Sequence, residues 1–255
     1  MNLIKIKTFI LSIITLFLLV TGSSMNFKYN SKPELLLHYI YREPITPSAR
    51  PPLMLILHGQ GADENDLFSM AKIFPDEFMV VSARAPYVFY NTYENIKKYQ
   101  WYDSEQIDGK WIMEKSQFKK SAVVIPKFIN QLIDKYKLDS TNVFILGFSQ
   151  GGIMAYAVGL TKPNEIRGIA VLSGKMPEEL KPMVNISEDL KKLNVFITHG
   201  IYDTNIEIGE AVKSVEYVKQ LGIDPVYKEY PKGHIISAAM RSDLLSWLNQ
   251  VEKNK

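Results

Sequence analysis

The chain has 255 residues, of which 46% are apolar and 22% charged, and its formal net charge is +3. These values are typical of a globular protein with a hydrophobic core and exclude a disordered or collagen-like chain. The absence of cysteine excludes disulfides, thiolate metal sites, cysteine nucleophiles and a lipid anchor on an N-terminal Cys. No two of the four histidines are close in sequence, so we expect no metal site and no cofactor.

The first 24 residues differ in composition from the rest. Lys5 and Lys7 precede an uncharged run of 13 residues, Thr8 to Val20, and small residues lead up to Met25. Such a run is typical of a signal peptide, because a membrane-spanning helix needs about 20 apolar residues. We therefore expect residues 1–24 to direct export to the periplasm or the medium. The alternatives are an uncleaved anchor, which would be the membrane contact of the chain, and a start at Met25, which would make the protein cytoplasmic.

The charge outside this leader is nearly balanced. Lys5 and Lys7 are two of the 30 basic residues, and the leader holds no acidic residue, so residues 25–255 carry 28 basic against 27 acidic side chains. A net charge of +1 gives no reason to expect nucleic-acid binding. Nothing in the sequence specifies an oligomeric state. Because no repeat, low-complexity tract or linker is apparent, we expect residues 25–255 to form a single domain.

From residue 33 onward, apolar runs alternate with amphipathic segments. The apolar runs predict strands at 35–41, 53–57, 78–83, 143–146, 169–172, 195–198 and 226–230. The amphipathic segments predict helices at 64–74, 116–136, 151–160, 207–221 and 235–247, with a kink or a break at Pro126. This alternation predicts an α/β fold with a mostly parallel, doubly wound sheet flanked by helices.

The segment 85–115 does not fit this alternation. Its pattern predicts a long irregular loop that is rich in aromatic residues, among them Phe89, Tyr99, Trp101 and Tyr102. Long loops are usually functional or mobile, and loops at the carboxyl ends of strands form the active sites of open α/β sheets. We therefore expect Trp101 and Tyr102 to wall a substrate pocket. The alternative is that these rings only cap the core.

A Gly-x-Ser-x-Gly pattern occurs at residues 147–151, between an apolar strand and a helical segment. The pattern alone is a modest signal, but this context is that of a nucleophile elbow. The glycines are needed because side chains two residues from the serine would collide with the neighbouring strand and helix. Ser149 is therefore the candidate nucleophile, and the N-terminus of the following helix favours negative charge beside it.

A serine hydroxyl needs a base, and after such an elbow the expected order is Ser, then Asp or Glu, then His. Only His199 and His234 follow Ser149. His234 lies in a turn after the last predicted strand, where an imidazole can reach the nucleophile, so we assign the base to it. We interpret His199, at the end of an apolar strand, as a structural residue hydrogen-bonded to the adjacent loop. Of the aspartates between Ser149 and His234, Asp203 follows a strand closely and is expected to orient the imidazole.

Acyl transfer also needs hydrogen-bond donors for the oxyanion, each worth roughly 3–4 kcal/mol. The elbow supplies one donor, the backbone N–H of Gln150. The loop after the strand at 53–57 contains Gly59, Gln60 and Gly61, and its flexible glycines let N–H groups point at a ligand. We therefore choose the N–H of Gln60 as the second donor. His58 is expected to brace this loop.

These blocks together resemble the bacterial phospholipase/carboxylesterase family of the α/β-hydrolases. The resemblance covers about residues 33–250 and rests on residues 57–67 (LHGQGADENDL), 101–103 (WYD), 147–152 (GFSQGG), 199–203 (HGIYD) and 233–234 (GH). It implies an α/β-hydrolase fold with little or no lid, a triad of Ser149, Asp203 and His234, and an oxyanion hole at Gln60 and Gln150. Acyl-protein thioesterases share the pattern, so the implied substrates are small or lipid-like esters or thioesters of short to medium acyl chains.

Two other functions are compatible with parts of the sequence. An exported esterase that removes acetyl or feruloyl groups from polysaccharides would fit the leader and the aromatic segment. A non-catalytic binding protein with a hydrolase fold would predict the loss of a triad residue or an oxyanion glycine, and none is lost. The sequence also departs from the family pattern in two respects. Members are commonly cytoplasmic, and they often have Phe where this chain has Tyr102, which would make the acyl pocket more polar.

Overall fold

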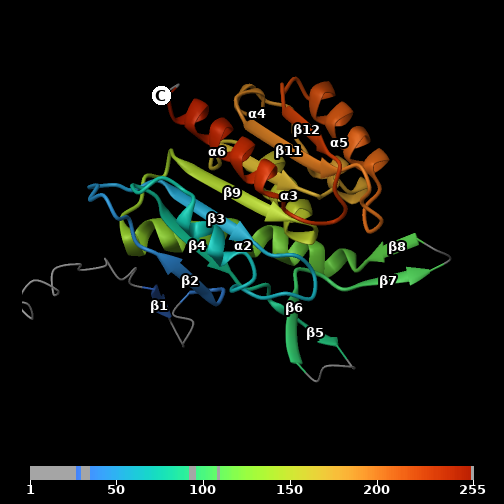
Figure 1. Cartoon of the computed structure of the whole chain (residues 1–255), viewed down its shortest axis with the longest axis horizontal. Coiled ribbons are helices and arrows are strands. Elements are labelled where there is room, and N and C mark those ends of the chain that lie inside the picture. Colours follow the sequence, from blue (N-terminus) through green and yellow to red (C-terminus); the bar gives the residue numbers. More distant parts are fainter. Residues whose placement is uncertain (1–26, 30–34, 92–95, 108–109, 254–255) are drawn as a thin grey trace, which may run out of the picture.

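The computed structural model describes residues 27–29, 35–91, 96–107 and 110–253, so the predicted leader lies outside the described residues. A sheet of eight strands, counted over these residues, crosses the molecule in the order β1-β2-β4-β3-β9-β10-β11-β12 (Figure 1). The strands are β1 (Phe27–Tyr29), β2 (Tyr39–Arg42), β3 (Leu53–Leu57), β4 (Met79–Ala83), β9 (Val143–Phe148), β10 (Gly168–Leu172), β11 (Asn194–Gly200) and β12 (Val226–Tyr230). From β4 to β12 all neighbours are parallel, whereas β1 and β2 are antiparallel. The predicted mostly parallel α/β sheet is confirmed.

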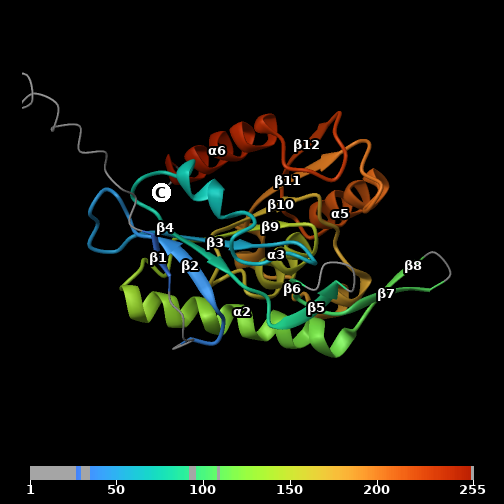
Figure 2. The ribbon, with the colours of Figure 1, turned by 60° about the horizontal axis from the view of Figure 1, so that its bottom comes forward.

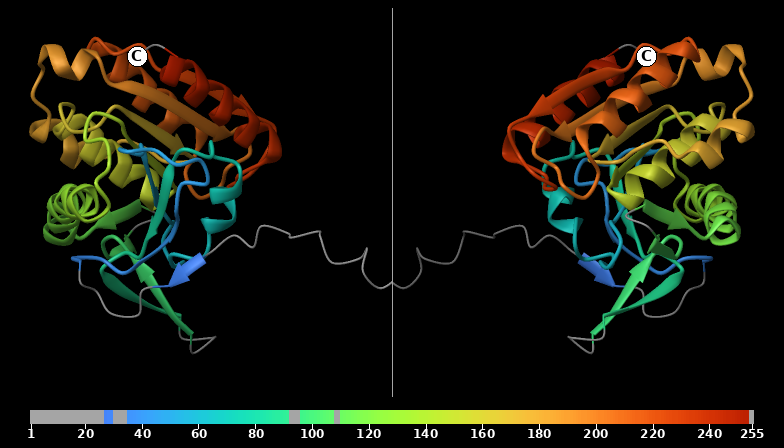
Figure 3. Two further views of the ribbon diagram at one scale, coloured as in Figure 1. Left: turned by 90° about the vertical axis from the view of Figure 1, so that its left-hand side faces the viewer. Right: turned by 90° about the vertical axis from the view of Figure 1, so that its right-hand side faces the viewer.

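Helices cover both faces of this sheet (Figures 2 and 3). One face packs against α2 (Lys115–Tyr136), α3 (Gln150–Thr161) and α5 (Ile208–Gln220), and the other against α6 (Ala238–Lys253) and the short 3₁₀ helix η2 (Phe68–Lys72). Two further short helices, η3 (Glu178–Met183) and α4 (Glu188–Lys191), lie between β10 and β11. Over the described residues, no helix combines the length and the apolar character needed to cross a membrane.

The strand β3 shows why its sequence is an uninterrupted apolar run. Leu53, Leu55 and Leu57 pack into the core on one face of the sheet, and Met54 and Ile56 pack into the core on the other. All five side chains are buried. A strand covered by helices on both faces has no solvent-facing side, so it does not alternate between apolar and polar residues.

The helix α3 lies between the sheet and α2, and this position explains its composition. Its residues 150–160 are all buried, and they contact β9 and β10 on one side and α2 on the other. A helix that is buried all round is apolar all round rather than amphipathic. The N-terminus of α3 is therefore held firmly at the carboxyl end of β9, where Ser149 joins the two elements.

Three predicted helices differ from those observed. The segment 64–74 forms turns and only the short η2, because Glu64 is drawn into the core by an ion pair with Arg84. The helix expected at 235–247 begins at Ala238 instead, since Ser237 caps it by accepting a hydrogen bond from the N–H of Met240 (3.2 Å). The break that was one of the two expectations at Pro126 is absent, because α2 is one helix through this buried residue.

The expectation of an irregular segment at 85–115 is wrong. It forms two antiparallel hairpins, β5 (Tyr87–Asn91) with β6 (Ile96–Gln100), and β7 (Ser104–Ile107) with β8 (Lys110–Met113). The backbone of Tyr99 exchanges two hydrogen bonds of 2.9 Å with Gly61 and Ala62 in the loop after β3. This pairing joins segments far apart in the sequence, and the local pattern of residues does not reveal it.

Candidate active site

Ser149 occupies a strained turn between β9 and α3. Its φ is 53° and its ψ is −117°, a left-handed conformation that costs a residue with a side chain about 1–3 kcal/mol. The N–H of Ser149 donates to the carbonyl of Leu172 in β10 (2.9 Å), which fixes the turn against the neighbouring strand. The side chain of Ser149 lines a pocket, as the elbow interpretation requires.

Two glycines make this turn sterically feasible. A Cβ atom on Gly147 would lie 2.1 Å from the carbonyl oxygen of Gly151. A Cβ atom on Gly151 would lie 2.1 Å from the carbonyl oxygen of Leu57, at the end of β3. Both distances are far below van der Waals contact and involve backbone, which cannot swing away. The collisions expected from the Gly-x-Ser-x-Gly spacing are therefore present.

Asp203 and His234 come from two turns at the same edge of the sheet. Nδ1 of His234 lies 2.6 Å from Oδ2 of Asp203. The other carboxylate oxygen of Asp203 accepts hydrogen bonds from the N–H groups of Asn205 (2.9 Å) and Ile206 (3.0 Å). The Asp203 side chain is fully buried, whereas that of His234 is 15% exposed and lines the pocket. The arrangement fixes the His234 ring and leaves its Nε2 free to accept a proton.

Close backbone packing holds these two turns together. The N–H of Ile201 donates to the carbonyl of Tyr230 (2.8 Å), and that of Tyr202 donates to the carbonyl of Lys232 (2.9 Å). A Cβ atom on Gly200 would lie 2.3 Å from the Lys232 carbonyl oxygen, so only glycine permits this approach. The turn that carries Asp203 and the turn that carries His234 are thus positioned by their main chains.

His199 is buried behind Asp203 and does not line the pocket. Its Nε2 lies 2.7 Å from the carbonyl oxygen of Ile206 and 3.3 Å from Oδ2 of Asp203. A carbonyl only accepts, so Nε2 carries the proton. Burial lowers the pKa of His199, although the Ile206 carbonyl and the Asp203 charge oppose this. His199 is thus a neutral donor to the adjacent loop, which agrees with the structural interpretation of this residue.

His58 braces the loop that follows β3. Its Nδ1 lies 2.7 Å from the carbonyl oxygen of Gly59 and therefore donates, while its Nε2 accepts from the N–H of Ala85 (3.0 Å). Burial lowers the pKa of this histidine and keeps it neutral, as one donor and one acceptor require. The loop beyond it brings Gly59 and Gln60 to the pocket beside Ser149 and Gln150.

The side chain of Gln150 anchors the elbow to the segment 101–102. Its Oε1 accepts from the N–H of Trp101 (2.6 Å), and its Nε2 donates to the carbonyl of Tyr102 (2.9 Å). Nε1 of Trp101 donates to the carbonyl of His58 (2.9 Å). Gln60 is held in turn by a hydrogen bond from its Nε2 to Oε1 of Gln100 (2.9 Å). One network therefore connects the two loops that carry the candidate oxyanion donors.

The expectation that Trp101 walls the pocket is wrong. Its indole is completely buried, and its N–H donates to the carbonyl of His58. Trp101 therefore supports the loop after β3 from within the core and is not among the residues that line the pocket. Tyr102 does line the pocket, and burial raises the pKa of its hydroxyl. The Tyr102 ring packs edge-on against Phe118 of α2, with 5.6 Å between the centroids.

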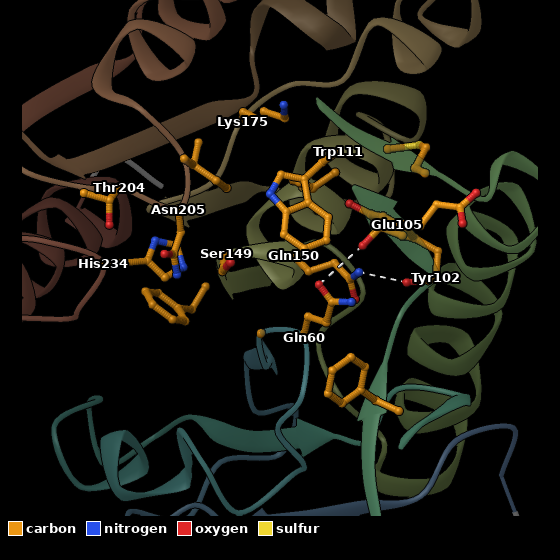
Figure 4. Close-up of a pocket in the computed structure, with 17 residues that line it drawn as sticks. Gln60, Tyr102, Glu105, Trp111, Ser149, Gln150, Lys175, Thr204, Asn205 and His234 are labelled. Carbon is orange, nitrogen blue, oxygen red and sulfur yellow. Dashed lines mark hydrogen bonds between the residues drawn. The ribbon is translucent and has the colours of Figure 1, made fainter. Parts of the chain in front are cut away.

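The pocket has a volume of about 810 Å³ (Figure 4). It brings together Ser149, Gln150, His234, Gln60 and Tyr102 of the sequence-derived candidates. Other side chains that line it have no recognisable site motif in the sequence, among them Trp111, Met113, Ile153, Thr204 and Asn205. Trp111 and Met113 have the spacing of one strand face, but Ile112 between them is also apolar, so residue type alone does not indicate which side of β8 faces the pocket. Among the described residues, no group of three or more His, Asp or Glu side chains could hold a metal ion.

The sequence is similar to those of known esterases and thioesterases. The sequence profile of a family described as phospholipase/carboxylesterase matches residues 44–252. Carboxylesterase SOBER1 of Arabidopsis thaliana is 31% identical over 128 residues, which cover 49% of this chain and 56% of that relative. The chain thus spans only about half the length of SOBER1 in this match. Acyl-protein thioesterase 1 of Candida albicans is 26% identical over 226 residues, covering 83% of this chain and 97% of that protein.

Solved structures show the same fold. The crystal structure of a carboxylesterase from Bacillus cereus superposes with a TM-score of 0.71 and covers 86% of this chain and 96% of that chain. The two sequences are 19% identical, so this likeness is one of fold. It supports the α/β fold described above.

The packing of the elbow predicts the effect of adding one methyl group. Gly151→Ala is expected to lower the free energy of unfolding by about 3 kcal/mol, because its Cβ overlaps the Leu57 carbonyl. Gly209→Ala is the matched control, since a Cβ there meets nothing within 4 Å in the helix α5. It should leave stability unchanged or raise it by up to about 1 kcal/mol. Urea unfolding measures both, and equal stabilities would show that the elbow tolerates a side chain at residue 151.

Proposed function

The chain belongs to the phospholipase/carboxylesterase family, and from this membership we propose that it is a serine hydrolase of carboxylic esters. One observation carries the proposal. Ser149, on its strained turn, lines the same pocket as His234, whose ring is held 2.6 Å from the buried Asp203 carboxylate. The substrates proposed are small or lipid-like esters. Relatives named acyl-protein thioesterase support extending the proposal to thioesters.

Ser149 is the proposed nucleophile and His234 the proposed general base. Because Nδ1 of His234 donates to Asp203, its Nε2 has the lone pair that can take the Ser149 proton. The serine oxygen then bonds to the carbonyl carbon of the ester. The Asp203 carboxylate stabilises the imidazolium that results, and its hydrogen bonds from Asn205 and Ile206 keep it oriented.

The negative charge that develops on the carbonyl oxygen needs donors that are already in place. We assign this role to the backbone N–H groups of Gln60 and Gln150, whose loops both border Ser149 in the pocket. Gln150 is the first residue of α3, so the positive end of the helix dipole adds to its effect. The side-chain anchors of Gln60 and Gln150 reduce the reorganisation needed when the charge forms.

The reaction then divides into two steps. The tetrahedral intermediate collapses, His234 protonates the departing alcohol or thiol, and the acyl group stays bonded to Ser149 Oγ. A water molecule next gives its proton to His234 and attacks the acyl carbonyl, and the same proton returns to Ser149 as the carboxylic acid leaves. No cofactor or metal is needed for this sequence.

The nucleophile is tested by removing its oxygen. Ser149→Ala is expected to lower kcat for p-nitrophenyl butyrate by about four to six orders of magnitude, because the three groups act as a unit. The circular dichroism spectrum should stay unchanged, since alanine removes only one oxygen atom. Full activity of this variant would refute the proposed mechanism. A wild-type chain without esterase or thioesterase activity would favour the binding-protein alternative.

The base is tested by comparing the two histidines near Asp203. His234→Asn should lose kcat to nearly the same extent as Ser149→Ala, because no group is left to accept the serine proton. His199→Asn should retain far more activity, since His199 lies outside the pocket and bonds to the Ile206 carbonyl. Steady-state kinetics of both variants decides the assignment. Loss of activity in His199→Asn alone would reverse it.

The leader supports a proposal about location. We propose that residues 1–24 direct export, on the basis of Lys5, Lys7 and the 13-residue uncharged run that follows. N-terminal sequencing of the native protein from fractionated cells is the measurement. A mature end near Ser24 or Met25 in a periplasmic or secreted fraction is the expected result. An intact Met1 in membranes would indicate an anchor, and a Met25 start in the cytosol would contradict export.

A further inference from the structure

An exposed tryptophan borders the pocket. Trp111 on β8 is 55% exposed, whereas the other two tryptophans of the chain, Trp101 and Trp247, are 0% and 5% exposed. The β7–β8 hairpin that carries Trp111 extends outward beyond the end of α2 (Figures 1 and 2). A large aromatic side chain left this accessible beside a pocket can gain much contact area when a ligand binds.

The strand register divides the hairpin into two faces. Met113 lies opposite Ser104, and Ile112 lies opposite Glu105. Since successive side chains point to opposite faces, Trp111 and Met113 share one face and Ile112 belongs to the other. Trp111 and Met113 both line the pocket, whereas Ile112 does not, although it is 45% exposed. Of the apolar side chains of β8, the pocket therefore takes Trp111 and Met113 from one face and not Ile112 from the other, where the partner of Ile112, Glu105, reaches the pocket rim instead.

The positions of the other pocket residues indicate which part of an ester reaches Trp111. In the proposed mechanism His234 protonates the leaving group, so that group must lie beside His234. Figure 4 shows Thr204 and Asn205 on this side of Ser149, and it shows Trp111 and Tyr102 on the opposite side. The acyl group, which stays on Ser149, must therefore extend toward Trp111.

We propose that Trp111 determines acyl-chain specificity by packing against acyl chains that extend well beyond an acetyl group. This inference rests on the proposed function and adds to it the residue that selects the acyl part. Met113 on the same hairpin face, together with Tyr102 and Ile153, also contributes to the lining of this pocket. A volume of about 810 Å³ is much larger than an acetyl group requires. Each methylene that leaves water against this wall should raise kcat/KM up to about fourfold.

A chain-length series tests the proposal. The kcat/KM values of wild type, Trp111→Ala, Trp111→Phe and Ile112→Ala are measured with p-nitrophenyl acetate, butyrate and octanoate below micelle-forming concentrations. Wild type should prefer octanoate to acetate, and Trp111→Ala should reduce this preference about tenfold while acetate turnover changes less than about twofold. Trp111→Phe should keep most of the preference. Ile112→Ala, the control on the opposite face, should keep all of it.

A second measurement does not depend on turnover. Because Trp111 is the exposed tryptophan, it should account for most of the iodide quenching of fluorescence, and Trp111→Phe should lose that quenching. The protein is then modified with ethylphosphonofluoridate or octylphosphonofluoridate, whose alkyl groups mimic acyl chains on Ser149. The octyl adduct should protect Trp111 from iodide, and the ethyl adduct should not.

Several results would overturn the inference. The first is a preference for octanoate over acetate that Trp111→Ala leaves unchanged. The second is a reduction of this preference in Ile112→Ala as large as that in Trp111→Ala. The third is equal iodide quenching of the ethyl and octyl adducts. A protein that neither hydrolyses the acetate ester nor reacts with either phosphonate would instead refute the proposed function. Turnover of all three esters by the wild type, with a chain-length preference that Trp111→Ala does not change, would leave the proposed function intact and reject only the role of Trp111.

Discussion

The close packing of the Ser149 turn against the end of β3 is the constraint on which the rest of the site depends. Gly151 approaches the Leu57 carbonyl so closely that a Cβ atom would lie 2.1 Å from its oxygen. This contact sets the separation between the loop that carries Gln60 and the helix that begins at Gln150. The proposed nucleophile and the two proposed donors thus come from distant parts of the chain to border one pocket, and the hydrogen bonds of the Gln150 side chain hold them there.

The parts of the fold that are determined by burial could be predicted from the sequence. β3 and β12 have the predicted bounds, and β3 was recognisable because a strand covered on both faces must be apolar throughout. Elements governed by tertiary partners could not be predicted. The helix expected at 64–74 is lost because Glu64 pairs with Arg84, 20 residues further on. The hairpin β5–β6 pairs through Tyr99 with the loop after β3, a contact that no local pattern encodes.

In the candidate site, too, features determined by local geometry could be predicted, and features determined by distant parts of the chain could not. The Ser149 turn was predictable because its geometry demands glycines at fixed spacing. Chain order and strand ends restrict its proposed partners to Asp203 and His234, whose side chains lie 2.6 Å apart. Trp101 and Trp111 look alike in the sequence but have opposite environments. A hydrogen bond to the His58 carbonyl buries Trp101, whereas the register of β7 with β8 turns Trp111 toward the pocket. Both outcomes depend on long-range backbone positions that residue type does not specify.

The proposed mechanism requires Ser149 and the N–H groups of Gln60 and Gln150 to act on one carbonyl group. The most direct test is a crystal structure of the adduct that the protein forms with a small alkylphosphonofluoridate. We expect a covalent bond from Ser149 Oγ to phosphorus, with the phosphoryl oxygen about 2.7–3.1 Å from both backbone nitrogens. A phosphonate attached to another residue, or a phosphoryl oxygen that faces solvent away from Gln60 and Gln150, would contradict it.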